Sequence, residues 1–170
     1  MKYFAYGSNM FCARLKAKNR VPSAQKIGVY TLTKHDLRFH KKSNGSAKCD
    51  AYQTGNEKDF ILGVLFDISS AEKEDLDKAE GLGHGYDQKT VSVLNDCGEI
   101  CEAVTYFATN IDASLKPYSW YKKHVVTGAR EADLAEEYVK KKIDVIVSVE
   151  DPCKERESEE LAIYGNKVPK

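Results

Sequence analysis

The sequence lacks an excess of charge of either sign. Its 26 Lys and Arg residues balance 26 Asp and Glu residues, so the formal net charge is zero at pH 7. A nucleic-acid-binding protein needs a surplus of basic side chains to neutralise phosphates, and a solvated acidic protein needs a surplus of carboxylates. We therefore expect no nucleic-acid partner.

Long hydrophobic runs are also missing. No stretch approaches the roughly 18 apolar residues of a transmembrane helix, and the first residues lack the charged and apolar segments of a signal peptide. These absences predict a cytoplasmic protein with no membrane partner. The sequence leaves the oligomeric state open, with a homodimer as one candidate.

Spacings typical of metal ligands do not occur. The five cysteines are odd in number, and the nearest pair, Cys97 and Cys101, falls in a predicted hairpin turn. His35 and His40 lie five apart on a predicted strand and so point to opposite faces. The other two histidines have no acidic or cysteine partner at ligand spacing. We expect free thiols, no metal site and no cofactor.

What the chain does contain is enough apolar material for one core. Its 170 residues, 42% of them hydrophobic, fit a single domain. Runs rich in aromatic and β-branched residues alternate with turn signals in the first two thirds, which predicts strands joined by hairpins in a curled sheet or barrel. The expected strands are Lys2–Tyr6, Ile27–Phe39, Phe60–Asp67, Lys89–Leu94 and Ile100–Thr109, with a loop over residues 41–47.

Helices are expected around this sheet. Ser69 followed by Glu72 is a capping-box pattern, and Gly81 stands where a left-handed C-cap falls, so residues 70–80 should be helical. Further helices are predicted for Met10–Lys16, from Pro117 to Glu131, and after Asp133. The predicted fold class is α+β: a mixed, curled β-sheet or small β-barrel with helices packed outside.

The end of the sequence differs from the rest. From Asp151 onward it is dense in charged residues and shows no core pattern, although Leu161, Ile163 and Tyr164 are able to dock. The predicted organisation is therefore a single domain over residues 1–150 and a charged C-terminal extension over residues 151–170.

The run YFAYGSNM ends the first predicted strand abruptly at Gly7-Ser8-Asn9. Where a strand stops and leads into a helix, the first backbone N–H groups of the helix are unpaired and point into one small volume. The positive end of the helix dipole points into the same volume. Such a volume suits an anion or a polarised carbonyl group. The simpler alternative is that Ser8 or Asn9 only caps the helix while Gly7 permits the turn.

Glu80 is the second informative residue, because a carboxylate in the last turn of a helix faces the negative end of the dipole. That placement costs about 0.3–1 kcal/mol. A general acid–base role would account for it, with Gly81-Leu82-Gly83 letting the chain approach a substrate closely. The alternative is a solvent-facing charge on a charged helix.

Both segments carry a resemblance to a known family. YFAYGSNM resembles the substrate loop of the γ-glutamylcyclotransferases, and LDKAEG resembles the segment that supplies their catalytic glutamate, at the position of Glu80. Similarity also covers Thr105–Asn110 and the two pieces Tyr121–Lys123 and Gly128–Glu131, and the resemblance spans about Lys2 to Ile146. It implies a closed or nearly closed β-barrel with helices packed outside.

The resemblance implies an enzyme that acts on a small γ-glutamyl compound. The substrate's α-amine attacks its own γ-carbonyl, which forms 5-oxoproline and releases an amine, while Glu80 acts as base and then acid. Backbone N–H groups of the loop would hold the substrate's carboxylate or the oxyanion. The implied binding residues are Tyr6, Gly7, Ser8, Asn9, Tyr86, Tyr106 and Tyr121.

Two other functions remain open. One is a related enzyme that acts on a γ-glutamylamine or another γ-glutamyl conjugate. The other is a noncatalytic anion-binding or interaction module on the same fold. The last two residues of the YGSN loop vary between branches of the superfamily, so the sequence does not define the leaving group.

Overall fold

Five strands close into a barrel in the computed structural model, which describes residues 1–165. The barrel order is β1 (Lys2–Ala5), β5 (Phe60–Asp67), β2 (Gln25–Thr33), β6 (Tyr86–Leu94) and β7 (Ile100–Ala108). Closure occurs at β1, which pairs antiparallel with β5 and parallel with β7. Phe4 and Phe66 are fully buried in the core. The predicted α+β barrel, with the β6–β7 hairpin, is confirmed.

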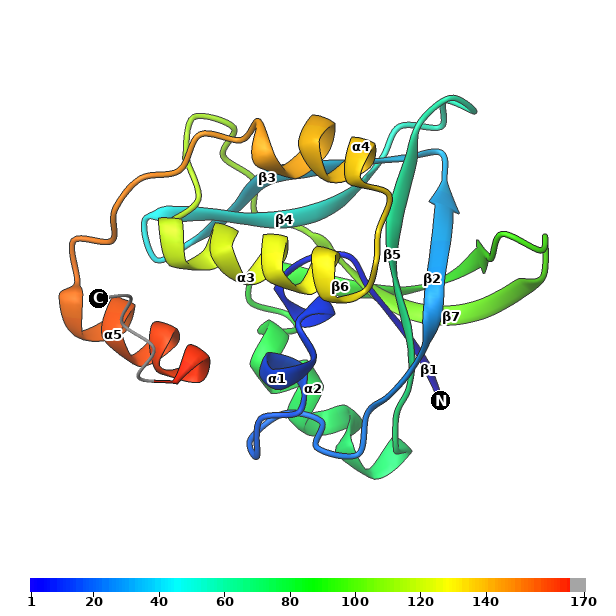
Figure 1. Ribbon diagram of the computed structural model, residues 1–170, viewed down its shortest axis with the longest axis horizontal. Helices are drawn as coiled ribbons and strands as arrows, with labels where there is room; N and C mark the ends of the chain where they lie inside the picture. Colours follow the sequence, from blue (N-terminus) through cyan, green and yellow to red (C-terminus); the bar gives the residue numbers. More distant parts are fainter. Residues whose placement is uncertain (166–170) are drawn as a thin grey trace.

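A separate two-stranded sheet stands beside the barrel (Figure 1). Its strands β3 (His35–Ser43) and β4 (Ser46–Gln53) pair antiparallel through the turn Asn44-Gly45. Both turn residues have left-handed φ angles, 49° and 75°, as a tight hairpin of primed type requires. This hairpin brings β4, a strand with no counterpart among the predicted ones, toward the end of β1.

Two predictions for this region are wrong. The single strand expected over Ile27–Phe39 is divided between β2 and β3, because Lys34 has a φ of 61° and turns the chain out of the barrel. The loop expected over residues 41–47 is instead the tip of the β3–β4 hairpin. The pair Asn44-Gly45 is a strong hairpin signal that would have indicated it.

The helix that ends at Glu80 has the predicted C-cap, but the capping box predicted at its start is only half formed, because the Ser69 N–H donates to Ser23 Oγ and not to Glu72. One 3-10 turn, Ser70–Glu72, leads into α2 (Lys73–Glu80), and the Ser69 side chain accepts a hydrogen bond from a backbone N–H of that turn. Gly81 ends α2 with a left-handed φ of 71°. The Glu72 carboxylate accepts hydrogen bonds from Ser23.

Other helices cover the outside of the sheets (Figure 1). They are a 3-10 turn Ser8–Met10, α1 (Cys12–Leu15), α3 (Ser119–Glu131), α4 (Glu136–Val139) and the π-helical turn Lys140–Asp144. The helix predicted from Pro117 begins two residues later, with Tyr118 as N-cap. Asp133, which the sequence suggests as the cap of the next helix, is instead a turn residue with a φ of 60°, and Ala135 is the N-cap of α4. No helix within residues 1–165 is long and apolar enough to cross a membrane.

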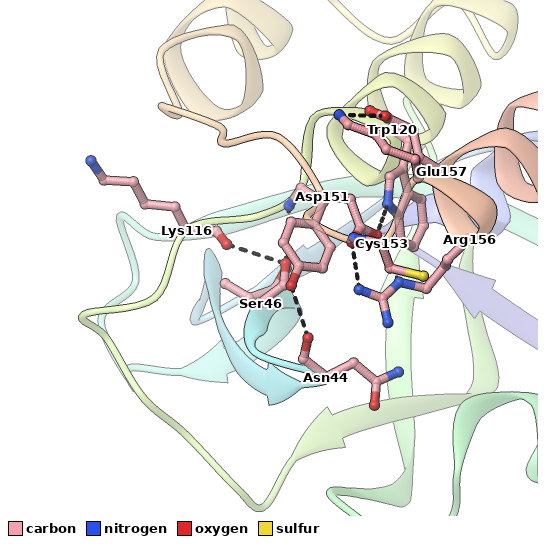
Figure 2. A network of polar contacts seen from close by, with 11 residues as sticks. Asn44, Ser46, Lys116, Trp120, Asp151, Cys153, Arg156 and Glu157 are labelled. Carbon is pink, nitrogen blue, oxygen red and sulfur yellow. Dashed lines mark hydrogen bonds and ion pairs between the residues drawn. The ribbon is translucent and has the colours of Figure 1, made fainter.

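The charged C-terminal segment forms α5 (Lys154–Leu161) and a 3-10 turn, Ala162–Tyr164. Figure 2 shows how buried Asp151 anchors it: this carboxylate accepts hydrogen bonds from Trp120 Nε1 at 2.8 Å and from the Arg156 guanidinium at 2.6 Å. The bond from Arg156, with that from Trp120, holds the pKa of Asp151 well below its usual range. Division of the chain at residue 150 remains a prediction.

Helix α3 lies against the loop that follows β1, which gives a prediction for stability. A Cβ atom on Gly128 would lie 2.6 Å from the Met10 carbonyl carbon. We expect Gly128→Ala to cost about 1–3 kcal/mol and to lower the melting temperature by several degrees, because the added methyl group overpacks the contact.

Gly28→Ala is the matched control for this measurement, since a Cβ atom there meets nothing closer than 3.9 Å. Circular dichroism melts of both variants check the prediction. Equal melting temperatures for the two variants would show that the α3–loop contact is not tight.

Candidate active site

Two adjoining pockets open where the loop after β1 meets the C-terminus of α2. The inner pocket, of about 30 Å³, is lined by all eight residues predicted as site residues, together with Tyr3 and Cys49. The outer pocket, of about 240 Å³, shares Ser8, Glu80 and two tyrosines with it. The structure thus brings the predicted residues together, and their individual roles remain predictions.

The loop residues Gly7 and Ser8 form one side of the inner pocket. Gly7 accepts a hydrogen bond from the Met10 N–H at 3.0 Å, so the chain turns within a single 3-10 turn. No side chain caps this turn or α1, so the simpler capping alternative for Ser8 and Asn9 is wrong. Within residues 1–165, the backbone N–H groups of Ser8 and Asn9 have no hydrogen-bond partner. They are therefore available to a ligand oxygen.

Glu80 lies at the boundary between the two pockets, with its side chain 17% exposed. The Asn9 amide donates to Glu80 Oε1 at 2.5 Å and to the Tyr3 hydroxyl at 3.0 Å. Arg20 donates to Asn9 Oδ1 at 3.2 Å and lies 3.8 Å from Glu80 Oε1. The alternative of a solvent-facing helix charge does not fit this placement.

Arg20 is a site residue for which the sequence carries no local signal, because it lies in an irregular segment between α1 and β2. Burial lowers the pKa of its guanidinium, and the neighbouring Arg14 lowers it further, while the Glu80 carboxylate acts in the opposite direction. Its charge lies beside a carboxylate that faces the negative end of a helix dipole. Arg20 thus offsets part of the electrostatic cost of Glu80.

Tyrosines form the remaining walls, and their hydroxyl groups are hydrogen-bonded. Tyr86 donates to the carbonyl oxygen of Cys49 at 2.5 Å, and Tyr121 accepts from the backbone N–H of Cys49 at 3.0 Å. Tyr106 donates to Asp77 Oδ1 at 2.6 Å. Burial raises the pKa of all three tyrosines. They therefore remain neutral and hold fixed positions around the pocket.

The outer pocket has a strongly basic wall that the sequence did not indicate. Lys41 and Lys48 reach it from the β3–β4 hairpin, and Arg156 reaches it from α5. Trp120 and Tyr121 of α3 complete that side. The hairpin and the C-terminal segment, which was predicted as an extension, both contribute to the surroundings of Glu80.

Histidines take no part in either pocket. His40 Nε2 lies 2.7 Å from Asp50 Oδ2 in a buried pair. His124, for which no acidic partner was expected at ligand spacing, lies 3.2 Å from Glu160. Among residues 1–165, no three His, Cys, Asp or Glu side chains gather in a group able to hold a metal ion.

Comparison with known proteins identifies relatives of this chain. The model of the AIG2-like family matches residues 60–141. The chain is 32% identical over 146 residues to a bovine (Bos taurus) γ-glutamylcyclotransferase, covering 82% of this chain and 75% of the relative. A human (Homo sapiens) γ-glutamylcyclotransferase is 31% identical over 147 residues, with the same coverage of each chain.

A solved structure of a γ-glutamyl cyclotransferase superimposes with a TM-score of 0.80 at 28% identity, covering 89% of this chain and 90% of the other. The barrel, its outer helices and this superposition define the γ-glutamylcyclotransferase-like fold class. The identity to the bovine and human relatives extends over most of both chains. The chain belongs to the γ-glutamylcyclotransferase family.

The buried thiol in the inner pocket gives a prediction for chemical labelling. Burial raises the pKa of Cys49 to about 12, whereas Cys97 and Cys153 are exposed. Because the thiolate is the reactive form, we expect iodoacetamide to label Cys97 and Cys153 and to spare Cys49 in the folded protein at pH 8. Peptide mass spectrometry measures the labelling, with urea-unfolded protein as the control. Labelling of Cys49 as fast as Cys97 would contradict this account.

Proposed function

We infer that the chain is a γ-glutamylcyclotransferase, which converts a γ-glutamyl amino acid or peptide to 5-oxoproline and releases the amine. One observation carries this inference: the Asn9 amide contacts the Glu80 carboxylate, so the YGSN loop and the helix-terminal carboxylate face the same pocket. The identity to the bovine relative supports it.

The reaction needs proton transfer and a folded substrate. The neutral α-amine of the γ-glutamyl unit attacks the γ-carbonyl carbon, the new C–N bond closes a five-membered lactam, and the original amide C–N bond breaks. The nucleophile is tethered to its target, so good geometry alone supplies effective molarities of about 10⁵ M or more. The chain must therefore fold the substrate and move two protons.

Glu80 is proposed as the group that moves both protons. Its carboxylate takes one proton from the α-ammonium group, which frees the lone pair of the amine, and passes this proton to the leaving nitrogen. The attacking nitrogen loses a second proton as the lactam forms, and Glu80 passes that proton to the leaving nitrogen as well, so the amine departs as an ammonium ion. Asn9 is proposed as a positioning residue, since its amide holds Oε1 at 2.5 Å and leaves the other oxygen of the carboxylate for the substrate. The net reaction consumes no water and leaves Glu80 unchanged.

The free N–H groups of Ser8 and Asn9 are proposed to bind the oxyanion that forms on the γ-carbonyl or the α-carboxylate of the substrate. Each preorganised donor at such a position is worth about 2.7–4 kcal/mol. The hydrogen-bonded tyrosines Tyr6, Tyr86, Tyr106 and Tyr121 are proposed to enclose the γ-glutamyl chain. Their fixed hydroxyl groups favour a single folded conformation of the substrate.

The location, partners and domain organisation of the chain are proposed from the sequence. We propose a cytoplasmic location, no nucleic-acid or membrane partner, and one domain over residues 1–150 with a charged extension. The equal numbers of acidic and basic residues support the absence of a nucleic-acid partner.

Replacement of Glu80 tests the proposed function. Glu80→Gln keeps the size and polarity of the side chain but transfers no proton, so we expect release of 5-oxoproline from γ-glutamyl dipeptides to fall by about 10²–10⁴-fold. The melting temperature should change little, because the loss of a charge disfavoured by the helix dipole is opposed by the loss of the carboxylate beside the mostly buried Arg20.

The matched control is Glu74→Gln on the exposed side of the same helix, which should keep full activity. Liquid chromatography of 5-oxoproline measures the rates. A folded Glu80→Gln protein within tenfold of the wild-type rate would remove Glu80 from the mechanism. A wild-type protein inactive on every dipeptide would instead favour the noncatalytic binding module.

A further inference from the structure

Lys41 and Lys48 face each other across the β3–β4 hairpin. They are directly paired in the register, and theirs is the first pair after the irregularity between Phe39 and Lys41. Like charges in directly opposed positions of an antiparallel pair repel each other and destabilise it. Without that shift in register, Lys41 would oppose Ala47. The hairpin therefore places two ammonium groups together at the wall of the outer pocket.

Every other cation of the outer pocket has a carboxylate partner. Arg14 pairs with Glu160, Arg156 pairs with Asp151, and Arg20 lies 3.8 Å from Glu80. Within residues 1–165, neither Lys41 nor Lys48 has a carboxylate oxygen within 4.0 Å of its Nζ, and neither Nζ forms a hydrogen bond. In the described part of the chain, Lys41 and Lys48 are thus the two cationic side chains of the pocket without a carboxylate in direct contact.

Aromatic rings hold these two side chains in place instead. Lys41 Nζ lies 4.6 Å from the centre of the Tyr86 ring, and Lys48 Nζ lies 3.9 Å and 4.0 Å from the Trp120 and Tyr121 rings. Such cation–π contacts orient an ammonium group but do not neutralise it. Lys41 is only 6% exposed, so water does not solvate it fully either.

Burial lowers the pKa of Lys48 to about 7, and the nearby Arg14 charge acts in the same direction. An anion beside Lys48 would raise this pKa again, because it stabilises the ammonium form. An isolated buried cation is costly unless it is paired, so the pair of lysines fits a site completed by a negatively charged ligand.

The charges of a γ-glutamyl substrate indicate which of its two halves carries the negative groups that would pair with Lys41 and Lys48. The γ-glutamyl half carries one α-ammonium and one α-carboxylate group, and so it brings no net charge to the site. Lys41 and Lys48 line the outer pocket but not the inner pocket, where the γ-glutamyl half is proposed to bind. Glu80 lies between the two pockets. The leaving group is therefore the part of the substrate that reaches them.

We propose, on the basis of the cyclotransferase function proposed above, that Lys41 and Lys48 form a subsite for two carboxylates of the leaving group. The preferred substrates are then γ-glutamyl compounds whose released amine is an acidic amino acid. A γ-glutamylamine leaves both ammonium groups unneutralised, and a leaving group with an additional cation is repelled. The outer pocket, of about 240 Å³, is much larger than the inner one and gives this leaving group room.

A pair of nearly isosteric dipeptides tests the subsite. γ-Glutamyl-glutamate and γ-glutamyl-glutamine differ by one carboxylate in the leaving group. We expect kcat/KM to be about 10- to 100-fold higher for γ-glutamyl-glutamate, as for a gain of a charge-assisted hydrogen bond, with most of the difference in KM. One of the two variants, Lys41→Met or Lys48→Met, should reduce this ratio toward 1, because it removes the partner of the side-chain carboxylate. The other should lower kcat/KM for both dipeptides, because it removes the partner of the α-carboxylate that they share.

Lys42→Met is the matched control, because Lys42 lies on the same strand but is exposed and outside both pockets. Its ratio should equal that of the wild type. Inhibition of the wild type by free glutamate, compared with free glutamine, repeats the test without any substitution, and glutamate should bind at least tenfold more tightly.

The possible results distinguish a failure of the proposed subsite from a failure of the proposed cyclotransferase function. Equal kcat/KM values for the two dipeptides, or an unchanged ratio in folded Lys41→Met and Lys48→Met proteins, would overturn the dicarboxylate subsite and leave the cyclotransferase function intact. Absence of 5-oxoproline from all dipeptides would overturn the proposed function, and the subsite with it.

Discussion

The hydrogen bond from the Asn9 amide to the Glu80 carboxylate is the contact on which the site depends. It joins residues 71 positions apart, one in the loop after β1 and one at the end of α2. The position of each segment is fixed by a glycine. Gly128 of α3 packs closely against the loop, and Gly81 ends α2 directly after Glu80. The barrel therefore acts as a frame that brings one carboxylate to one row of backbone donors.

Electrostatic cost is concentrated in this small region, although the chain as a whole has no net charge. Glu80 faces the negative end of its helix, and Arg20 and Asn9 offset that cost from one side. On the other side, Lys41 and Lys48 are paired across the β3–β4 hairpin, and within residues 1–165 neither has a carboxylate in direct contact. Charged side chains in unfavourable positions are expected at a ligand-binding site, because the bound ligand offsets their electrostatic cost. Such a site favours function at the expense of stability.

Local chemistry in the sequence drew attention to two segments, Gly7-Ser8-Asn9 and Glu80, but the resemblance to the γ-glutamylcyclotransferases was needed to predict them as parts of one site. The end of the first strand at Gly7, the caps of α2 and the position of Glu80 all depend on neighbouring residues. The outer pocket could not be predicted in that way. The pairing of Lys41 with Lys48 arises from a shift in strand register, and Arg20 reaches Glu80 only through the tertiary fold. The hairpin itself was predictable from its turn residues, whereas the left-handed Lys34 that separates it from the barrel has no such signal.

A double-mutant cycle between Asn9 and Glu80 tests the central contact most directly. The rate of 5-oxoproline release would be measured for wild type, Asn9→Ala, Glu80→Gln and the double variant under the same conditions. If Asn9 acts by holding the carboxylate, Asn9→Ala slows the wild type by about tenfold or more and has almost no further effect once Glu80 is replaced. Equal effects of Asn9→Ala in both backgrounds would show that the two residues act independently, and would contradict the account.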